Sequence, residues 1–168
     1  MKDIIYHEKV NSKKTAGLFL SLTILFLILF LWRVLAIGLD GLAIFLCVLF
    51  SIFLFYVINY RRLEIYLNAQ ILYLKFGLFH WRVPLENIAK ISLDAISPLK
   101  RWGGAGIHFM FVDGRYRASF NLLEHPRVVI QFKKKIGPVR DLSFSTCSPD
   151  RLIDLITGSI ESIHASNS

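Results

Sequence analysis

The sequence predicts an α+β protein, in which a two-helix transmembrane hairpin precedes a small domain of antiparallel strands closed by a C-terminal helix. Two long uncharged apolar runs occupy most of the first 60 residues. Short alternating runs separated by turn signals follow them, and the last segment repeats its apolar residues at helical spacing. The chain has 168 residues and is 54% hydrophobic, which exceeds the usual share for a soluble domain.

Each apolar run is long enough to cross a bilayer, which takes about 20 apolar residues. The first reads "AGLFLSLTILFLILFLW" and reaches Ile37 with one charge, Arg33, whose long side chain extends to the headgroups. The second, "GLAIFLCVLFSIFLFYVIN", has no charge. A cleaved signal peptide is the alternative for the first run, but such peptides have a shorter apolar core and no second span directly after it. We therefore expect spans at 15–37 and 38–60.

The connection between the two runs is so short that the helices must be antiparallel neighbours with both flanks on one side. Lysines precede the first span, Arg61 and Arg62 follow the second, and the turn between them offers Arg33 against Asp40. Because positive charge stays inside, we expect residues 1–14 to be a cytoplasmic N-terminal segment and 61–168 a cytoplasmic domain.

The domain from residue 61 onward has the pattern of about seven short strands and one helix. "LEIYLN" and "ILYLKF" alternate on either side of Ala69-Gln70, and "HWRVPL" and "IAKISLDAI" follow. Asp113-Gly114 marks a hairpin between "IHFMFV" and "RYRASF", and "RVVIQF" pairs with "VRDLSF" across "KKKIGP". In "SPDRLIDLITGSIESI", Ser148 is a helix N-cap and Pro149 the first helical residue.

The run "RRLEIYLNAQILYLKFGLFHWRVPLENIAKI" resembles the opening of the bacterial pleckstrin-homology-like (PH-like) domains of small membrane proteins. Gly77, Pro84, Leu85 and Ile88 occupy the positions of that pattern. "RWGGAGIHF" is similar to a Gly-rich segment of one subgroup, although Ala105 stands where an aromatic residue is usual. The resemblance implies a PH-like barrel or split sheet in a multi-pass protein of the bacterial cytoplasmic (inner) membrane. It implies no particular ligand.

The sequence contains no motif of a familiar enzyme or cofactor site. Gly104-Ala105-Gly106 could supply the first two glycines of a dinucleotide fingerprint, but Phe109 stands at the position of the third and a strand pattern follows in place of a helix. No Walker motif occurs. The five histidines share no metal-ligand spacing, the carboxylates are scattered, and neither G-x-S-x-G nor S-x-x-K is present. Cys47 and Cys147 form no disulfide framework. We expect a non-enzyme without cofactor or metal.

The basic residues are the better indication of function, since the formal charge is +8 and most of the excess follows residue 60. Cations beside a bilayer attract anionic headgroups, whereas a solvated basic face with ordinary topology signals is the plainer alternative. Nucleic acid is not expected as a partner, because strand alternation explains the interleaved aromatic residues. The candidate headgroup contacts are Arg61, Arg62, Lys75, Arg82, Lys100, Arg101, Arg115, Arg117, Lys133, Lys134 and Lys135.

Three functional hypotheses follow from these features. The first is a non-catalytic membrane protein whose domain is a protein- or lipid-interaction module, an accessory subunit of a larger membrane assembly. The second is a sensor of anionic lipid or of the envelope that reads the bilayer with its basic face. An enzyme with an unfamiliar site is the third reading. The protein partner is not specified by the sequence, and homo-oligomerisation stays open.

Overall fold

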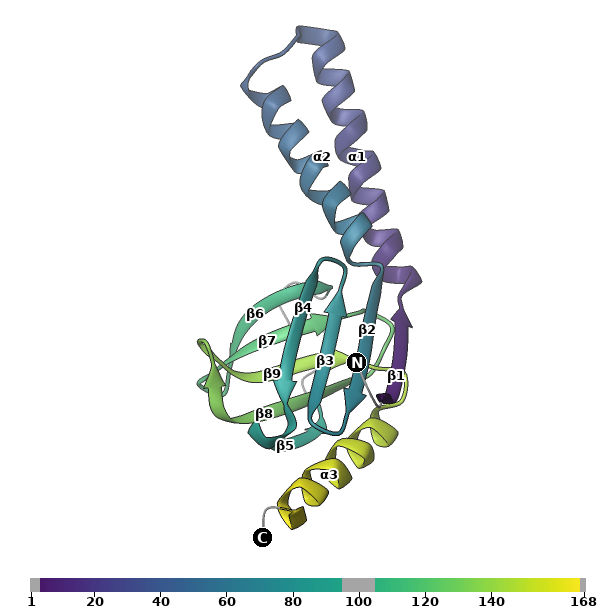
Figure 1. The fold of residues 1–168 in the computed structure, drawn as a ribbon. Helices are drawn as coiled ribbons and strands as arrows, with labels where there is room; N and C mark the ends of the chain where they lie inside the picture. Colours follow the sequence, from purple (N-terminus) through teal and green to yellow (C-terminus); the bar gives the residue numbers. More distant parts are fainter. Residues whose placement is uncertain (1–3, 95–104, 167–168) are drawn as a thin grey trace.

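The computed structural model describes residues 4–94 and 105–166 and contains two apolar helices, two β-sheets and a C-terminal helix (Figure 1). The helices are α1 (Lys13–Ile37), α2 (Gly41–Asn59), the 3₁₀ helix η1 (Leu85–Asn87) and α3 (Pro149–Ser166). The strands are β1 (Ile4–Asn11), β2 (Arg62–Asn68), β3 (Ile71–Phe76), β4 (Phe79–Pro84), β5 (Ile88–Leu93), β6 (Gly106–Val112), β7 (Arg115–Asn121), β8 (Arg127–Ile136) and β9 (Val139–Ser145). The predicted order of helical hairpin, strands and C-terminal helix is confirmed from α1 onward, but the strand β1 precedes the hairpin.

Helices α1 and α2 are antiparallel neighbours that stand away from the sheets (Figure 1). The mean hydropathy of their most apolar stretches is 2.5 and 2.8, and only 11% and 6% of those stretches is buried inside the protein. Both helices are thus long and apolar enough to cross a membrane, and they differ from the mostly buried core helix of a soluble protein. At their remote turn, Asp40 caps α2 by accepting a hydrogen bond from the Ala43 N–H and pairs with Arg33.

The first sheet, sheet A, has the strand order β1-β2-β3-β4, and all its pairs are antiparallel. The pairing of "LEIYLN" with "ILYLKF" and the strand after Gly77 are confirmed. Strand β1 was not predicted, because the segment before the spans was treated as a tail. Its alternation is interrupted by Glu8, which lies between the buried Tyr6 and Val10. The domain therefore takes strands from both sides of the helical hairpin.

The second sheet, sheet B, has the order β5-β8-β9-β7-β6. Both predicted hairpins are confirmed, and Asp113 and Gly114 have φ values of 49° and 74°, as the tight turn from β6 to β7 requires. The expectation that every strand is antiparallel is wrong, since β7 and β9 are parallel. The β8–β9 hairpin docks on β7 through its second strand, which runs in the same direction as β7.

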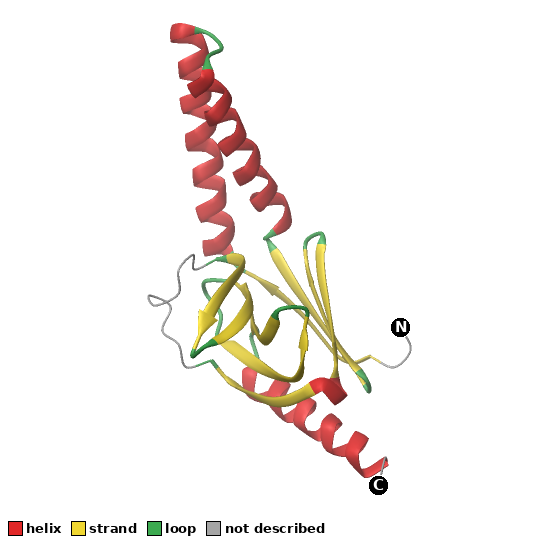
Figure 2. Cartoon of the chain, turned by 90° about the vertical axis from the view of Figure 1, so that its left-hand side faces the viewer, coloured by secondary structure: helices red, strands yellow, loops and turns green. Residues whose placement is uncertain are grey.

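The two sheets face each other across one hydrophobic core (Figure 2). Among the described residues no ladder joins sheet A to sheet B. Of the two expected forms, a barrel or a split sheet, the closed barrel is therefore absent there, and the domain has two layers. The layers are held by apolar burial, worth about 1.5–3 kcal/mol for each fully buried Leu or Phe. Fully or almost fully buried core residues include Leu63, Ile65, Leu74, Phe76, Phe120, Ile130, Leu142 and Phe144.

Helix α3 closes the domain at the end opposite the helical hairpin, where it packs on β5, η1 and β8 (Figure 1). The Leu152 N–H donates to the Ser148 carbonyl (3.1 Å), which places Ser148 at the predicted N-cap. Leu152 and Ile156 are completely buried. The amphipathic stripe expected from the sequence therefore covers the sheet.

Candidate functional site

The helical hairpin and the domain meet at a junction where two helices continue directly as two neighbouring strands. Strand β1 ends at Asn11 and α1 begins at Lys13, while α2 ends at Asn59 and β2 begins at Arg62. Ser12 caps α1 by accepting a hydrogen bond from the Thr15 N–H (3.0 Å). Because β1 and β2 are paired, the junction holds the starts and ends of both helices in one place.

A pocket of about 600 Å³ opens at this junction, and we call it the junction pocket. Polar and apolar side chains both line it. Its cations are Lys13, Arg61, Arg62 and Lys75, and Glu64 is its one carboxylate. Three of these cations were predicted as headgroup contacts, and the fold brings them together. Lys13 was not among the predicted residues, although its place at the start of the first apolar helix was a usable signal.

Hydrogen bonds fix the acid and one arginine of the junction pocket. Arg62 Nε donates to Asn11 Oδ1 (3.1 Å), and Arg62 Nη1 lies 3.8 Å from Glu64 Oε1. The Tyr66 hydroxyl donates to Glu64 Oε2 (2.6 Å). This hydrogen bond, followed by the charges of Lys75, Lys9 and Arg62, holds the pKa of Glu64 below its ordinary value. Glu64 is thus ionised at neutral pH, and the four cations outnumber it.

The rim of the pocket depends on a close approach between the β3–β4 turn and the end of α2. Gly77 has φ 61°, and a Cβ at this position would lie 2.3 Å from the Asn59 carbonyl oxygen. The Leu78 N–H donates to Asn59 Oδ1 (3.2 Å), and Asn59 Nδ2 donates to the Phe55 carbonyl (2.9 Å). Only glycine fits there without displacing the helix end.

A column of aromatic rings connects the helices to the core of the domain. Tyr60 stacks between Tyr56 and Phe76, with centroid distances of 5.0 Å to each. Gly106 lies against the same ring, since a Cβ there would be 3.0 Å from Tyr60 Cδ2, and its φ is 86°. The glycine of "RWGGAGIHF" that the structure describes therefore lies at a bend beside an aromatic ring and leads into β6. Arg101 and Trp102 of the same segment lie outside the described residues.

The outer face of sheet A extends from the junction pocket and carries a row of neighbouring rings, which we call the aromatic ladder. It consists of His7, Tyr66, Tyr73 and His80, one residue from each strand, with successive centroid distances of 4.3, 6.0 and 6.1 Å. Arg82 lies over Tyr73, 5.7 Å from the ring centroid. A smaller pocket of about 290 Å³ includes Arg82, Tyr73 and Ile4. Arg82 therefore shares a face with Lys75 but not its pocket.

The lysine run at 133–135 belongs to a different part of the molecule. The Asn87 side chain bonds the backbone of Lys134 at both its N–H (2.8 Å) and its carbonyl (2.9 Å). Asn87 ends η1, which follows the end of β4 farthest from the helical hairpin. These three lysines are exposed, but they are not brought to the junction pocket. Lys100 and Arg101 lie outside the described residues.

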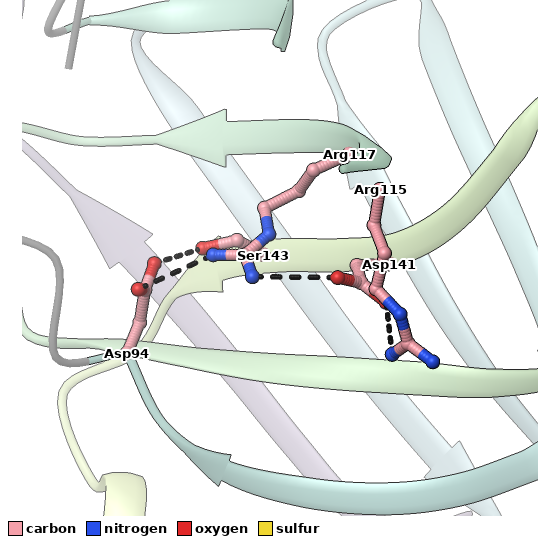
Figure 3. A network of polar contacts seen from close by, with 5 residues as sticks. All are labelled: Asp94, Arg115, Arg117, Asp141 and Ser143. Atoms are coloured by element: carbon pink, nitrogen blue, oxygen red, sulfur yellow. Dashed lines mark hydrogen bonds and ion pairs between the residues drawn. The ribbon is translucent and has the colours of Figure 1, made fainter. Parts of the chain in front are cut away.

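Two of the predicted headgroup residues, Arg115 and Arg117, instead form a network with carboxylates on sheet B (Figure 3). Arg117 Nη1 lies 3.4 Å from Asp94 Oδ1, and Arg117 Nη2 lies 3.4 Å from Asp141 Oδ2. Arg115 Nη1 lies 3.2 Å from Asp141 Oδ1. Arg117 is 7% exposed and Asp141 1%. The prediction of a headgroup contact is wrong for Arg117, because its guanidinium is buried against two acids.

This buried network lies on the face of sheet B opposite the hydrophobic core. Along β7, Arg117 and Ser119 alternate with Ala118 and Phe120, and the latter two belong to the core. Ser143 Oγ donates to Asp94 Oδ2 (2.7 Å) on the same side (Figure 3). Arg115 and Arg117 are thus each paired with a carboxylate of Asp94 or Asp141 inside the domain, and the arrangement suits a structural role.

A cysteine and a histidine far apart in sequence also meet in the fold. Cys147 Sγ lies 3.6 Å from His125 Nδ1, and the Cys147 N–H donates to Glu8 Oε1 (2.6 Å). Burial and then the neighbouring Glu8 raise the pKa of Cys147 to about 11. The thiol is therefore protonated at neutral pH, whereas a nucleophilic cysteine needs the thiolate. Nothing in the spacing of these residues signalled the contact.

Comparisons of this chain with protein-family models, with curated proteins and with solved structures found no match. Within the described parts of the chain, no group of three His, Cys, Asp or Glu residues is arranged to hold a metal ion. The junction pocket is the described pocket in which four cations face one carboxylate.

Proposed function

We propose that this chain is a non-catalytic integral membrane protein of a bacterial inner membrane, in which α1 and α2 cross the bilayer and the two-sheet domain is a cytoplasmic interaction module that binds anionic lipid headgroups. The junction pocket carries the proposal: four cations against one carboxylate gather where both helices meet the domain. The element order and the closing helix support a PH-like domain, here as a split sheet.

The depth of the pocket fits a phosphate headgroup. Helix α2 has 19 residues, about 28 Å at 1.5 Å per residue, close to the hydrocarbon thickness of about 30 Å. Asn59 then lies at the boundary between acyl chains and headgroups, and so does the pocket that it lines. At the other end of the hairpin, Arg33 is neutralised by Asp40. The positive end is therefore the domain end, which favours a cytoplasmic location for the domain.

The chemistry of the pocket suits a phosphodiester better than a neutral headgroup. Lys13 and Lys75 supply ammonium groups from α1 and β3, while Arg61 and Arg62 supply guanidinium groups that can bind two phosphate oxygens at once. Each well-placed cation near a bilayer contributes about 1 kcal/mol of attraction to anionic lipid. The non-catalytic assignment is supported by the protonated Cys147 thiol and by the paired acids of the buried network.

The test uses the full chain, because β1 precedes α1 and is required to complete sheet A. Spin-labelled phosphatidylglycerol and phosphatidylcholine are compared by electron paramagnetic resonance for the reconstituted protein. We expect the protein to prefer phosphatidylglycerol over phosphatidylcholine. Each of the substitutions Arg61→Gln, Arg62→Gln and Lys75→Gln should reduce this preference roughly fivefold. High salt should also weaken the preference. The matched control removes three charges by Lys133→Gln, Lys134→Gln and Lys135→Gln and should change nothing. Equal loss in both variants would overturn the proposal, because net charge alone would explain it.

Protein binding by the outer face of sheet A is the second candidate function, and the aromatic ladder favours it. This face presents Lys9, Lys75 and Arg82 beside exposed or half-exposed rings, which suits an acidic protein segment. Purification in mild detergent tests it: a stoichiometric partner should be lost in Tyr73→Ala and Arg82→Ala but kept in Arg61→Gln. Loss of the partner in Arg61→Gln alone would assign the partner to the junction pocket.

A further inference from the structure

The turn between β3 and β4, together with the first residue of β4, places two apolar side chains beside the end of α2. Leu78 is 74% exposed and Phe79 44% exposed. Tight turns of soluble domains are instead usually formed by Gly, Pro, Asn, Asp or Ser. Gly77 and the Leu78 N–H both contact Asn59, the last residue of α2. The tip of the turn is thus fixed at the level where the apolar helix ends.

Phe79 reaches back along the side of α2. Its ring lies 6.3 Å from the Phe55 ring in an edge-to-face arrangement (83°) and also 6.3 Å from Tyr60. Phe55 precedes Asn59 by four residues, which is about one helical turn or 6 Å along the axis. Phe79 therefore lies beside the apolar surface of α2 and not beyond its end.

The exposed apolar surface of α2 continues onto this turn without interruption by charge. On the helix, Ile58 is 66% exposed and Phe55 37%, and Phe79 contacts Phe55 directly. The cations of the junction pocket, among them Lys75 and Arg61, form a basic margin next to the turn. An apolar tip with a basic margin matches the boundary between acyl chains and headgroups, where apolar groups enter and cations stay outside.

From this continuity we infer that the β3–β4 turn is a third membrane-inserted element, with Leu78 and Phe79 immersed at the acyl-chain boundary of the same bilayer that α2 crosses. The inference rests on the proposed function for the transmembrane position of α2, but it does not require recognition of anionic headgroups. Insertion of the turn gives the domain a contact with the bilayer outside the helical hairpin. That contact restricts rotation of sheet A about the hairpin and holds the junction pocket at headgroup depth.

The experiment places a single environment-sensitive fluorophore on the full chain in the background Cys47→Ser and Cys147→Ser. Labelled positions are Leu78→Cys at the turn, Ile58→Cys on α2, and Ala69→Cys in the β2–β3 turn at the opposite end of sheet A. The protein is reconstituted in neutral phosphatidylcholine vesicles, so that headgroup charge plays no part. Quenching is measured with lipids that carry a nitroxide on the acyl chain and with aqueous iodide.

We expect the label at position 78 to behave like that at position 58, with strong quenching by the nitroxide lipid and little by iodide. The label at position 69 should show the reverse. Quenching of position 78 by iodide to the same degree as position 69, while position 58 is quenched by lipid, would overturn the insertion of the turn alone. Iodide access at both 58 and 78 would instead overturn the transmembrane position of α2 and with it the proposed function. Protection of position 78 from both quenchers would mean that protein, and not lipid, covers the turn, and would also overturn the inference.

Discussion

The junction pocket and the buried network contain the same kinds of charged side chain, but the network buries and pairs them whereas the pocket leaves them exposed and unbalanced. In the network, Arg117 is 7% exposed and lies between two acids. In the pocket, the Arg62 side chain is 54% exposed and Glu64 is the one acid among four cations. Buried, paired charges stabilise a fold only while every partner is present. Unbalanced, exposed charges contribute little to stability and remain available for a ligand.

The largest effect should come from breaking the buried network. Asp141→Asn leaves Arg117 and Arg115 without one carboxylate inside the protein, which should lower the free energy of unfolding by about 3–5 kcal/mol. Urea denaturation of the full chain in detergent, followed by tryptophan fluorescence, measures it. Asp154→Asn on the exposed side of α3 is the control and should change stability by less than about 0.5 kcal/mol. Equal stabilities for the two variants would contradict the description of the network as buried and coupled.

The stability of the fold around the junction pocket should depend more on backbone packing than on the ion pairs of the pocket. Gly77→Ala combines a positive φ with a Cβ 2.3 Å from the Asn59 carbonyl oxygen, so the turn must move and stability should fall by about 1–3 kcal/mol. The same denaturation experiment measures the loss. Gly114→Ala is the control, because Gly114 also has a positive φ but open space around it. It introduces backbone strain without a steric clash, so its loss of stability should be smaller. A smaller cost for Gly77→Ala than for Gly114→Ala would contradict the close approach at α2.

Removing the acid of the pocket should scarcely affect stability and should strengthen lipid selectivity. Glu64→Gln keeps an acceptor for the Tyr66 hydroxyl and removes the one carboxylate among the residues that line the pocket. The free energy of unfolding should change by less than about 1 kcal/mol, while preference for phosphatidylglycerol over phosphatidylcholine should rise by at most about fivefold. Denaturation and spin-labelled lipid binding measure the two quantities. Reduced selectivity would show that Glu64 orients the cations instead of opposing the ligand.

The smallest effect on stability should come from the titration of Cys147, whose thiol is partly exposed and lies beside one acid, Glu8. Because its pKa is raised to about 11, alkylation by iodoacetamide in a Cys47→Ser background should be slow at pH 8 and increase up to about pH 11. The folded thiol binds its proton more tightly than the unfolded thiol, so stability should decrease slightly as pH rises from about 9 towards 11. Glu8→Gln should shift the alkylation profile to lower pH, since Glu8 contributes to the raised pKa. An alkylation midpoint near the ordinary thiol pKa of about 8.5 would contradict this.

Local patterns predicted the elements well because each element's signal lies within a few residues. The φ values at Asp113 and Gly114 follow from the turn dipeptide itself, and the start of α3 follows from Ser148 and Pro149. Strand β1 was missed because the segment before the spans was treated as a tail, and Glu8 also interrupts its alternation. Glu8 points inward to bind the Cys147 N–H and the Thr146 hydroxyl (2.6 Å each), and that requirement comes from residues almost the whole chain away.

The sequence by itself determined the apolar hairpin, most of the strands and the closing helix, since composition, alternation and helical spacing are properties of neighbouring residues. It also determined that Arg61 and Arg62 lie directly at the end of the second apolar helix. The tertiary structure alone decided which arginines serve stability and which stay open to a ligand. Arg117 and Lys75 look alike in sequence, but β9 brings Asp141 to the first, and the β3–β4 turn brings the second to the ends of both helices. Whether a basic side chain serves stability or stays open to a ligand therefore depends on whether the fold places a carboxylate beside it.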